Sequence, residues 1–319
     1  MSSAETTFEQ PLIQLRQRIA ELEGFDDQGG NDAEIEKLRR TLDKKTRDVF
    51  QQLDNWQTTL VARHTDRPFT LDYVERIMDD WVELHGDRGF ADDAAIVSGL
   101  ATFRGRSVAV VGHQKGRSTR GRIRRNFGQP RPEGYRKALR IFKLAERFSL
   151  PVLTFIDTPG AYPGIGAEER GQAEAIARNL IEMAALKVPI IVTLTGEGGS
   201  GGALALGVGN RVFMLQYSIY SVISPEGCAA ILWKDQGRKA DASKALRLTA
   251  SEIASLGVVD KVIDEPVGGA HTDPELMSQR VGAAIEGALT ELEGLSGDEL
   301  VEDRARKFRA LGVFEGSRF

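Results

Sequence analysis

Apolar residues recur at helical spacing along the first 64 residues of the chain. The first stripe holds four of them: Leu12, Leu15, Ile19 and Leu22. A Gly/Asp-rich break follows at residues 24–32, and a second stripe begins at Ile35 and continues to Leu60. Stripes of this period predict amphipathic helices, and the break predicts that they fold back on each other as a hairpin. We expect residues 1–65 to form a helical N-terminal extension, which packs on the rest of the chain, as we favour, or on a partner.

The rest of the chain, residues 66–319, changes to short apolar runs between amphipathic stretches. A helix is expected at 71–85, followed by two strands at 96–103 and 107–112 that form a hairpin. The next expected elements are a helix at 134–148, a strand at 151–157, a helix at 167–186 and a strand at 190–195. Two successive strand–loop–helix units are typical of a parallel sheet, so the predicted fold class is α/β. Two helices are expected to close this main domain at its C-terminal end.

A glycine-rich stretch directly follows the strand at 190–195. Its residues are Gly196, Glu197, Gly198, Gly199, Ser200, Gly201 and Gly202. Because glycine has no Cβ, a ligand can approach this main chain closely. The stretch is predicted to open a short helix, whose first N–H groups have no acceptor within the helix. These features predict an anion site of the oxyanion-hole type, made of backbone amides. A tight turn that packs closely explains the glycines equally well.

Three other glycine motifs match parts of this stretch. A dinucleotide fingerprint starting at position 196 requires an acidic residue about 20 positions further on, and none lies between Glu197 and Glu226. A phosphate-binding P-loop requires lysine at position 202, which is glycine. A nucleophile elbow remains, with Ser200 as the nucleophile and His271 as the one downstream histidine. A serine hydrolase therefore stays as an alternative.

A second loop rich in glycine and proline, residues 158–166, follows the strand at 151–157. Like the first stretch, it comes between a buried strand and a helix. Ligands of parallel sheets bind at the carboxyl ends of the strands. The two loops are therefore predicted to contribute to one shared site, although a plain turn would also explain the second loop.

A basic run without acidic residues covers positions 113–128. Its cations are Lys115, Arg117, Arg120, Arg122, Arg124 and Arg125. A charge run of this kind is most often a solvated loop, and contacts to nucleic acid or to a phosphate-rich small molecule are the alternatives. The net charge of the whole chain, −4, argues against nucleic acid.

Composition narrows the remaining possibilities. The 319 residues, 41% of them hydrophobic, suffice for a large core. A single cysteine, Cys228, excludes an internal disulfide and a cysteine-based zinc cluster. The four histidines lack metal-binding spacing, so no metal site is expected. There is no apolar run long enough for a membrane helix, and residues 1–5 do not read as a signal peptide. We therefore expect a cytoplasmic protein without a membrane segment.

Several stretches together resemble one known family over nearly the whole chain. They cover residues 113–117, 124–128, 132–138, 155–164, 196–205 and 220–227. With these motifs the chain resembles the alpha subunits of bacterial acetyl-coenzyme A carboxylase carboxyltransferases. The resemblance implies a crotonase-like fold, in which repeated β-β-α units spiral into stacked sheets, with the helical hairpin as an N-terminal extension.

The resemblance also implies a reaction and a set of partners. The carboxyl group of carboxybiotin, carried by the biotin carboxyl carrier protein, is transferred to acetyl-CoA, giving malonyl-CoA for fatty acid biosynthesis. The implied partners are a beta subunit that carries a zinc ribbon, the carrier protein and biotin carboxylase, with two alpha and two beta chains in the assembly. Two oxygens gain negative charge in this reaction, and fixed donors stabilise each of them.

Site residues follow by motif position. The resemblance assigns Gly201 and Gly202 to the carbonyl oxygen of biotin. The residues expected to line the same pocket are Gly160, Ala161, Gly198 and Gly199. The residues expected to meet the phosphates of coenzyme A are Lys115, Arg117, Arg124 and Arg125. No titrating side chain is required for this chemistry, and no metal is expected in this chain.

Overall fold

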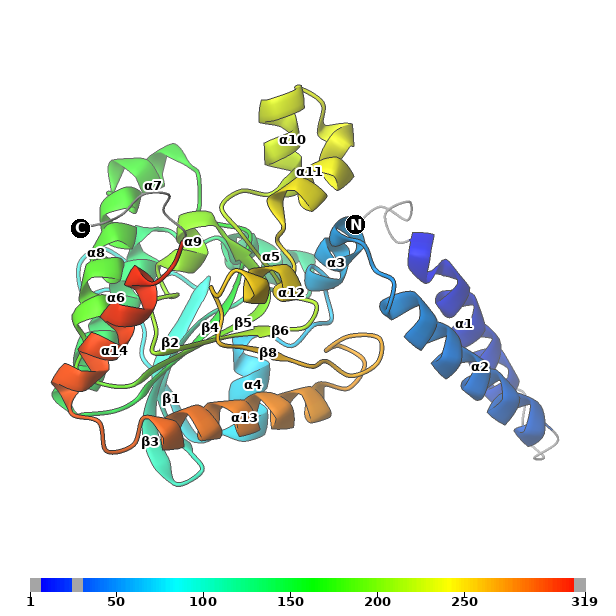
Figure 1. Cartoon of the computed structure of the whole chain (residues 1–319), viewed down its shortest axis with the longest axis horizontal. Coiled ribbons are helices and arrows are strands. Elements are labelled where there is room, and N and C mark those ends of the chain that lie inside the picture. Colours follow the sequence, from blue (N-terminus) through cyan, green and yellow to red (C-terminus); the bar gives the residue numbers. More distant parts are fainter. Residues whose placement is uncertain (1–6, 25–30, 313–319) are drawn as a thin grey trace.

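The computed structural model describes residues 7–24 and 31–312. The interpretation of residues 1–5 therefore concerns positions outside the described residues. Most of the hairpin break predicted at 24–32 also lies outside them. The described residues form one mixed α/β body with a helical hairpin that projects from it (Figure 1).

The N-terminal helices lie side by side as an antiparallel pair, as predicted. They are α1 (Gln10–Gly24) and α2 (Asp32–Phe50), and a third helix, α3 (Asn55–Ala62), leads back to the body. At the outer part of the pair, Ile19 and Leu22 pack on Ile35. At its base, a separate small core contains Leu12, Phe50, Val61 and Tyr217. The hairpin thus has little core of its own, and its base is anchored on the body.

One sheet of eight strands organises the described body. The strands are β1 (Asp79–Glu83), β2 (Ile96–Phe103), β3 (Arg106–His113), β4 (Val152–Thr158), β5 (Ile190–Gly199), β6 (Arg211–Leu215), β7 (Ile219–Ser221) and β8 (Lys261–Ile263). Their order is β1-β2-β3-β4-β5-β6-β8, and β7 pairs with the end of β5. The first three strands pair antiparallel, and the strands from β3 onward pair parallel. The predicted parallel sheet is confirmed for this part.

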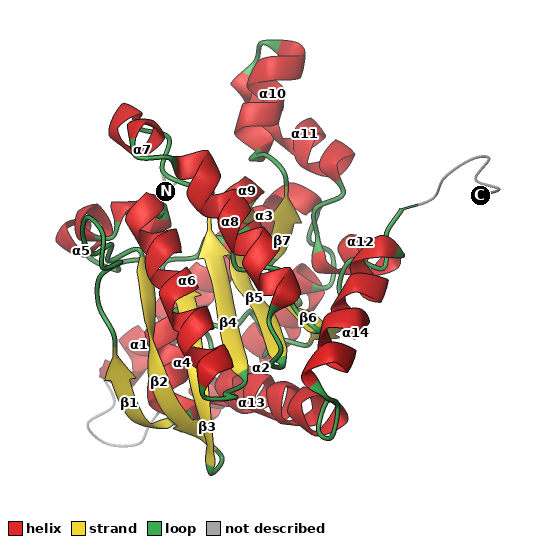
Figure 2. Cartoon of the chain, turned by 90° about the vertical axis from the view of Figure 1, so that its left-hand side faces the viewer, coloured by secondary structure: helices red, strands yellow, loops and turns green. Residues whose placement is uncertain are grey.

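Helices cover both faces of the sheet (Figure 2). One face is covered by α6 (Pro132–Arg147) and α8 (Gln172–Ala185), and the other by α4 (Thr70–Ile77) and α13 (Pro274–Glu291). In β4, Val152 and Ile156 belong to the first core, whereas Leu153 and Phe155 belong to the second. This alternation follows from the period of two along a strand.

The remaining helices lie around the ends of the strands. They are α5 (Thr119–Arg124), α7 (Ile165–Glu169), α9 (Ser200–Leu204), α10 (Pro225–Trp233), α11 (Lys239–Leu246), α12 (Ala250–Ser255) and α14 (Gly297–Arg309). The pair α10 and α11 projects beyond the carboxyl ends of β4 and β5 (Figure 2). Within the described ranges, no helix is both long and apolar enough to cross a membrane.

The helix predicted at 71–85 is wrong in its second half. The helix ends at Ile77, and β1 forms the edge of the sheet instead. A Cβ on Gly99 would lie 2.1 Å from the carbonyl oxygen of Val82, so the bare glycine allows β1 to approach β2. The helix predicted at 167–186 is also interrupted, since Gly171 has a φ of +81° between α7 and α8. The basic run is not one loop, because it contains α5.

Candidate functional site

The glycine-rich stretch covers the last four residues of β5 and the first three of α9, and the chain turns tightly where the two elements meet. Strands β4 and β5 run parallel, and Thr158 at the end of β4 is the partner of Gly198. The turn reverses the chain at Ser200, whose φ of +52° is unusual for a residue with a side chain. As the second and third residues of α9, Gly201 and Gly202 have amides without an acceptor inside the helix.

The loop after β4 packs directly against this turn. A Cβ on Gly199 would lie 2.2 Å from the carbonyl oxygen of Pro159, and one on Gly202 would lie 2.5 Å from the backbone of Gly160 and of Ala161. Real Cβ atoms do not approach backbone atoms this closely, so both glycines are required by packing. The structure therefore brings together the two loops that the sequence predicted to share a site.

A cavity of about 450 Å³ opens on the other side of the turn. Its lining is mainly apolar and includes Ser200, Gly201, Leu204, Tyr220, Val222 and Phe308. A Cβ on Gly201 would lie 3.6 Å from its nearest neighbour, Ile176, which is an ordinary van der Waals contact, so this position tolerates a small side chain. Of the predicted site residues, Gly201 reaches the cavity, whereas Gly198 packs on Leu194 and Tyr220 and Gly202 is buried. A backbone amide and an apolar cavity thus adjoin at the turn.

Charged side chains lie buried close to the turn, and the sequence reasoning missed most of them. The ammonium of Lys115 lies 2.6 Å from Asp157 and 2.8 Å from Glu197. Arg63 contacts the other oxygen of Glu197 at 2.7 Å and Glu226 at 2.6 Å. Since Lys115 binds two carboxylates, it cannot meet a phosphate without breaking that arrangement.

A signal for this cluster is present in the sequence. Lys115, Asp157 and Glu197 each follow or end one of three consecutive strands, β3, β4 and β5. The carboxyl ends of neighbouring parallel strands lie at one edge of the sheet. The order of the strands along the chain is therefore enough to indicate that these three charges can pair.

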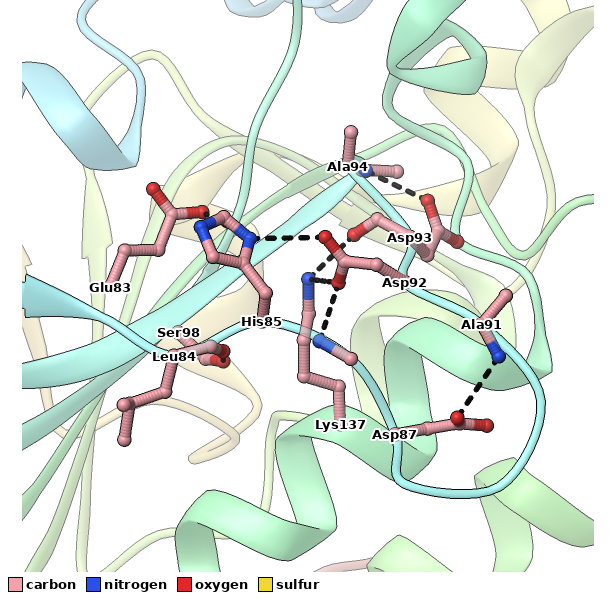
Figure 3. Close-up of polar contacts among 12 residues, drawn as sticks. Glu83, Leu84, His85, Asp87, Ala91, Asp92, Asp93, Ala94, Ser98 and Lys137 are labelled. Carbon is pink, nitrogen blue, oxygen red and sulfur yellow. Dashed lines mark hydrogen bonds and ion pairs between the residues drawn. The ribbon is translucent and has the colours of Figure 1, made fainter.

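A second polar cluster joins α6 to the segment between β1 and β2 (Figure 3). Lys137, which is buried on α6, donates to Asp92 at 2.6 Å and to the carbonyl oxygen of Asp93 at 2.8 Å. These contacts contribute to lowering the pKa of Asp92 to about 2, against the effect of its partial burial. Nearby, the carboxylate of Asp93 accepts the N–H of Arg131 at 2.6 Å. The preceding carbonyl, that of Pro130, accepts the N–H of Tyr162 at 2.9 Å, which links α6 to the loop after β4.

Comparison with known proteins agrees with this geometry. The family model of acetyl co-enzyme A carboxylase carboxyltransferase-like proteins matches residues 5–312. The chain belongs to this family. The acetyl-coenzyme A carboxylase carboxyl transferase subunit alpha of Syntrophotalea carbinolica is 57% identical over 310 residues, 97% of this chain and 98% of the relative. The corresponding protein of Geobacter metallireducens is 58% identical over 316 residues, 98% of this chain and 99% of the relative.

Solved structures of a transcarboxylase and a malonate decarboxylase share the fold. A transcarboxylase 12S chain aligns with a TM-score of 0.56 at 23% identity, covering 72% of this chain and 42% of that chain. A malonate decarboxylase hetero-tetramer of Pseudomonas, solved with coenzyme A, aligns with a TM-score of 0.56 at 18% identity, covering 69% and 88%. At these identities the likeness concerns the fold alone, and it confirms the expected crotonase-like architecture.

The other basic residues that the family resemblance assigned to phosphates lie near the surface. Arg117 is exposed but donates to Asp72 at 2.7 Å. Arg125 donates to the carbonyl oxygen of Ala94 at 2.8 Å, and Arg124 is exposed at the end of α5. The structure thus leaves Arg117, Arg124 and Arg125 closer to solvent than Lys115.

The histidine proposed for a serine hydrolase lies in a different environment. The ring of His271 stacks on that of His64, with centroids 3.8 Å apart. Burial first, and then the nearby charges, lower the pKa of His271 to about 3. No histidine is among the described residues that line the cavity at Ser200. The hydrolase alternative is therefore not favoured.

Within the part of the chain that the structure describes, no group of three or more His, Cys, Asp or Glu side chains could hold a metal.

Proposed function

We propose that this chain is the alpha subunit of an acetyl-CoA carboxylase carboxyltransferase. In this role it transfers the carboxyl group of carboxybiotin, on its carrier protein, to acetyl-CoA and yields malonyl-CoA for fatty acid biosynthesis. The observation that carries the proposal is that Gly201, at the start of α9, lines an apolar cavity in a chain of this family. An apolar cavity with few polar groups suits a small organic ligand.

Backbone amides supply the catalytic stabilisation in this proposal. Carboxybiotin brings the carboxyl group, and the amides of Gly201 and Gly202 donate to its ureido carbonyl oxygen, where negative charge develops. Such fixed donors need no reorganisation during the reaction. Gly160, Ala161, Gly198 and Gly199 do not line this cavity in the structure, and their proposed role is to hold the glycine stretch in shape from behind. No side chain of this chain exchanges a proton.

The partners follow from the same role. A zinc-ribbon beta subunit provides the donors for the thioester oxygen, and two alpha and two beta chains form the working assembly with the carrier protein and biotin carboxylase. Arg117, Arg124 and Arg125 are the proposed contacts for the phosphates of coenzyme A. Lys115 is set apart from them, because two carboxylates bind it. The cytoplasm is the proposed location.

Reconstitution tests this function directly. The full chain, combined with its cognate beta subunit and a carboxylated carrier protein, is expected to form malonyl-CoA from acetyl-CoA. The Gly202→Ala variant is expected to lose about 10²-fold in rate, because its Cβ would meet the backbone of Gly160 and Ala161 and displace the amides. The matched Gly201→Ala variant has room for its Cβ and should lose much less.

Binding of the beta subunit is measured in parallel by size-exclusion chromatography. A Gly202→Ala variant that assembles with the beta subunit and turns over at the rate of the unmodified chain would show that the glycine turn is not the oxyanion site. An unmodified complex that produces no malonyl-CoA would remove the proposed function itself.

A further inference from the structure

Five charged side chains form a continuous network beneath the glycine turn, and the proposed chemistry does not use them. They are Arg63, Lys115, Asp157, Glu197 and Glu226. The side chains of Lys115, Asp157 and Glu197 are 16%, 4% and 8% exposed, so the centre of the network is shielded from water. Ion pairs in such an environment are held far more rigidly than pairs on the surface.

The network joins the two loops of the site. Asp157 lies three residues before Gly160, and Glu197 lies four residues before Gly201. The ammonium of Lys115 bridges their carboxylates, and Asp157 also accepts the backbone N–H of Glu197 at 2.9 Å. A Cβ on Gly196 would lie 2.4 Å from that oxygen of Asp157, so the absence of a side chain at Gly196 allows the carboxylate to approach β5. A change at Lys115 or Glu197 therefore alters the distance between the loops.

The net charge of the network distinguishes an electrostatic role, in which the network stabilises the oxyanion, from a positioning role, in which it holds the two loops in place. Two cations face three carboxylates, which leaves a net charge of −1 behind the turn. A negative charge there opposes an oxyanion, so the network cannot act by stabilising it. We propose that Lys115 and Glu197 are positioning residues, which clamp the ends of β4 and β5 so that the glycine amides keep their catalytic geometry. This inference rests on the proposed function of the turn.

Glu197 and Lys115 stay ionised around neutral pH. Although burial alone would raise the pKa of Glu197, Lys115 and Arg63 lower it to about 2. The carboxylates of Asp157 and Glu197 raise the pKa of Lys115 against the effect of its burial. Burial and then the charge of Lys115 lower the pKa of His113, which also faces the network, to about 3. Arg67, which is paired with Glu265, and the buried Tyr73 face the network from the side of Asp157. We therefore expect no titration of the intact clamp between pH 6 and 8.

Three variants of the alpha chain, each assembled with the beta subunit, test the clamp. The reverse reaction is measured with malonyl-CoA and free biotin as the probes. Glu197→Gln is expected to lower kcat about tenfold and to change KM for biotin less than about threefold, because a misplaced turn affects the transition state most. An electrostatic role predicts the opposite, since this change removes the net negative charge and should raise kcat.

Lys115→Met provides the second arm. It removes the cation that bridges Asp157 and Glu197, while Arg63 still pairs with the other oxygen of Glu197, so kcat at pH 8 should fall about 10²-fold. Protonation of one carboxyl group restores a hydrogen bond between them, because two close carboxylates raise one pKa. The activity of this variant should therefore recover about tenfold between pH 8 and pH 6 relative to the unmodified enzyme. A purely structural defect would not recover on acidification.

Lys187→Met is the matched control. Lys187 pairs with Asp298 at 2.7 Å, but the two side chains are 60% and 84% exposed, and kcat should stay unchanged. A Glu197→Gln enzyme as fast as the unmodified one, or a Lys115→Met enzyme with an unchanged pH profile, would overturn the clamp. If the Lys115→Met variant does not assemble with the beta subunit, the kcat of the Glu197→Gln variant decides whether the clamp proposal holds. An unmodified complex without any exchange activity would instead refute the proposed function.

Discussion

Two ion pairs with nearly the same length lie in contrasting parts of the molecule. Arg67 and Glu265 are 2.8 Å apart beneath the carboxyl end of β5, with side chains 1% and 0% exposed. Arg39 and Glu23 are 2.7 Å apart on the N-terminal hairpin, with side chains 59% and 44% exposed. Distance alone would rank the two pairs as equals. Because one pair is buried and the other is exposed, the loss of each should change the free energy of unfolding by a different amount.

Both members of the buried pair make further hydrogen bonds to the backbone, whereas the exposed pair joins two helices at a solvent-exposed surface. Arg67 also donates twice to the carbonyl oxygen of Thr195, directly before the glycine stretch. Glu265 accepts the N–H groups of Tyr217 and Ala270. Removing one partner leaves a buried charge without compensation, but an exposed charge is simply hydrated again. The comparison teaches that burial decides the energetic weight of a pair, and the site region is where the buried pairs gather.

Breaking the buried pair should give the largest effect. Arg67→Met leaves Glu265 as an uncompensated charge in the interior, and the free energy of unfolding should fall by about 3–5 kcal/mol. Urea unfolding followed by circular dichroism measures this loss. The double variant Arg67→Met with Glu265→Leu removes the stranded charge and should recover part of it. A loss below about 1 kcal/mol for the single variant would contradict the comparison.

His271 is a buried titratable group without an ionic partner, and its effect on the free energy of unfolding should be intermediate. His271 stacks on His64, and the charged groups nearby are Arg16, Asp66 and Arg67. The pKa of His271 is about 3 in the folded chain and about 6.5 when unfolded. The unfolded state therefore binds a proton first, and stability falls as the pH drops below about 6.5.

Replacing His271 by phenylalanine keeps an aromatic ring for the stack and removes the titrating group. The loss of unfolding free energy between pH 7 and pH 5 should then shrink by about 2 kcal/mol relative to the unmodified chain. Urea unfolding at the two pH values gives the difference. Equal losses in both chains would mean that the folded protein accepts the proton at His271.

The sequence predicted those parts of the fold that repeat a strong local pattern. The amphipathic helix α6 and the strand β4 appear close to their expected positions. The second N-terminal stripe is divided into α2 and α3, and β5 extends to Gly199, four residues beyond the expected end of the strand. The strand β1 was missed because five residues of mixed polarity carry no clear period. Its formation depends on the contact with Gly99 on another strand. Information of this kind lies in tertiary packing rather than in a local window.

In the candidate site, too, some features could be predicted from the sequence, whereas others depend on tertiary contacts. Glycine-rich loops after two successive strands were visible as a shared site, because their order along the chain fixes their place at one edge of the sheet. The clamp was not predicted, although the order of the strands could have indicated the pairing of Lys115 with Asp157. The contact of Arg63 with Glu197 carried no such signal, because Arg63 is 134 residues away and lies in the segment assigned to the N-terminal extension. Lys115 was grouped with neighbouring arginines by composition, although its side chain points to carboxylates from distant strands.

The exposed pair should give the smallest effect and set the lower end of the comparison. Arg39→Met removes a contact to Glu23 between α1 and α2, and the free energy of unfolding should change by less than about 1 kcal/mol. The residual effect should also disappear at about 1 M salt, because counterions screen exposed charges at that ionic strength. Urea unfolding at low and high salt measures both values. A loss comparable to that of Arg67→Met, unchanged by salt, would mean that the hairpin pair is shielded from water by a partner in solution.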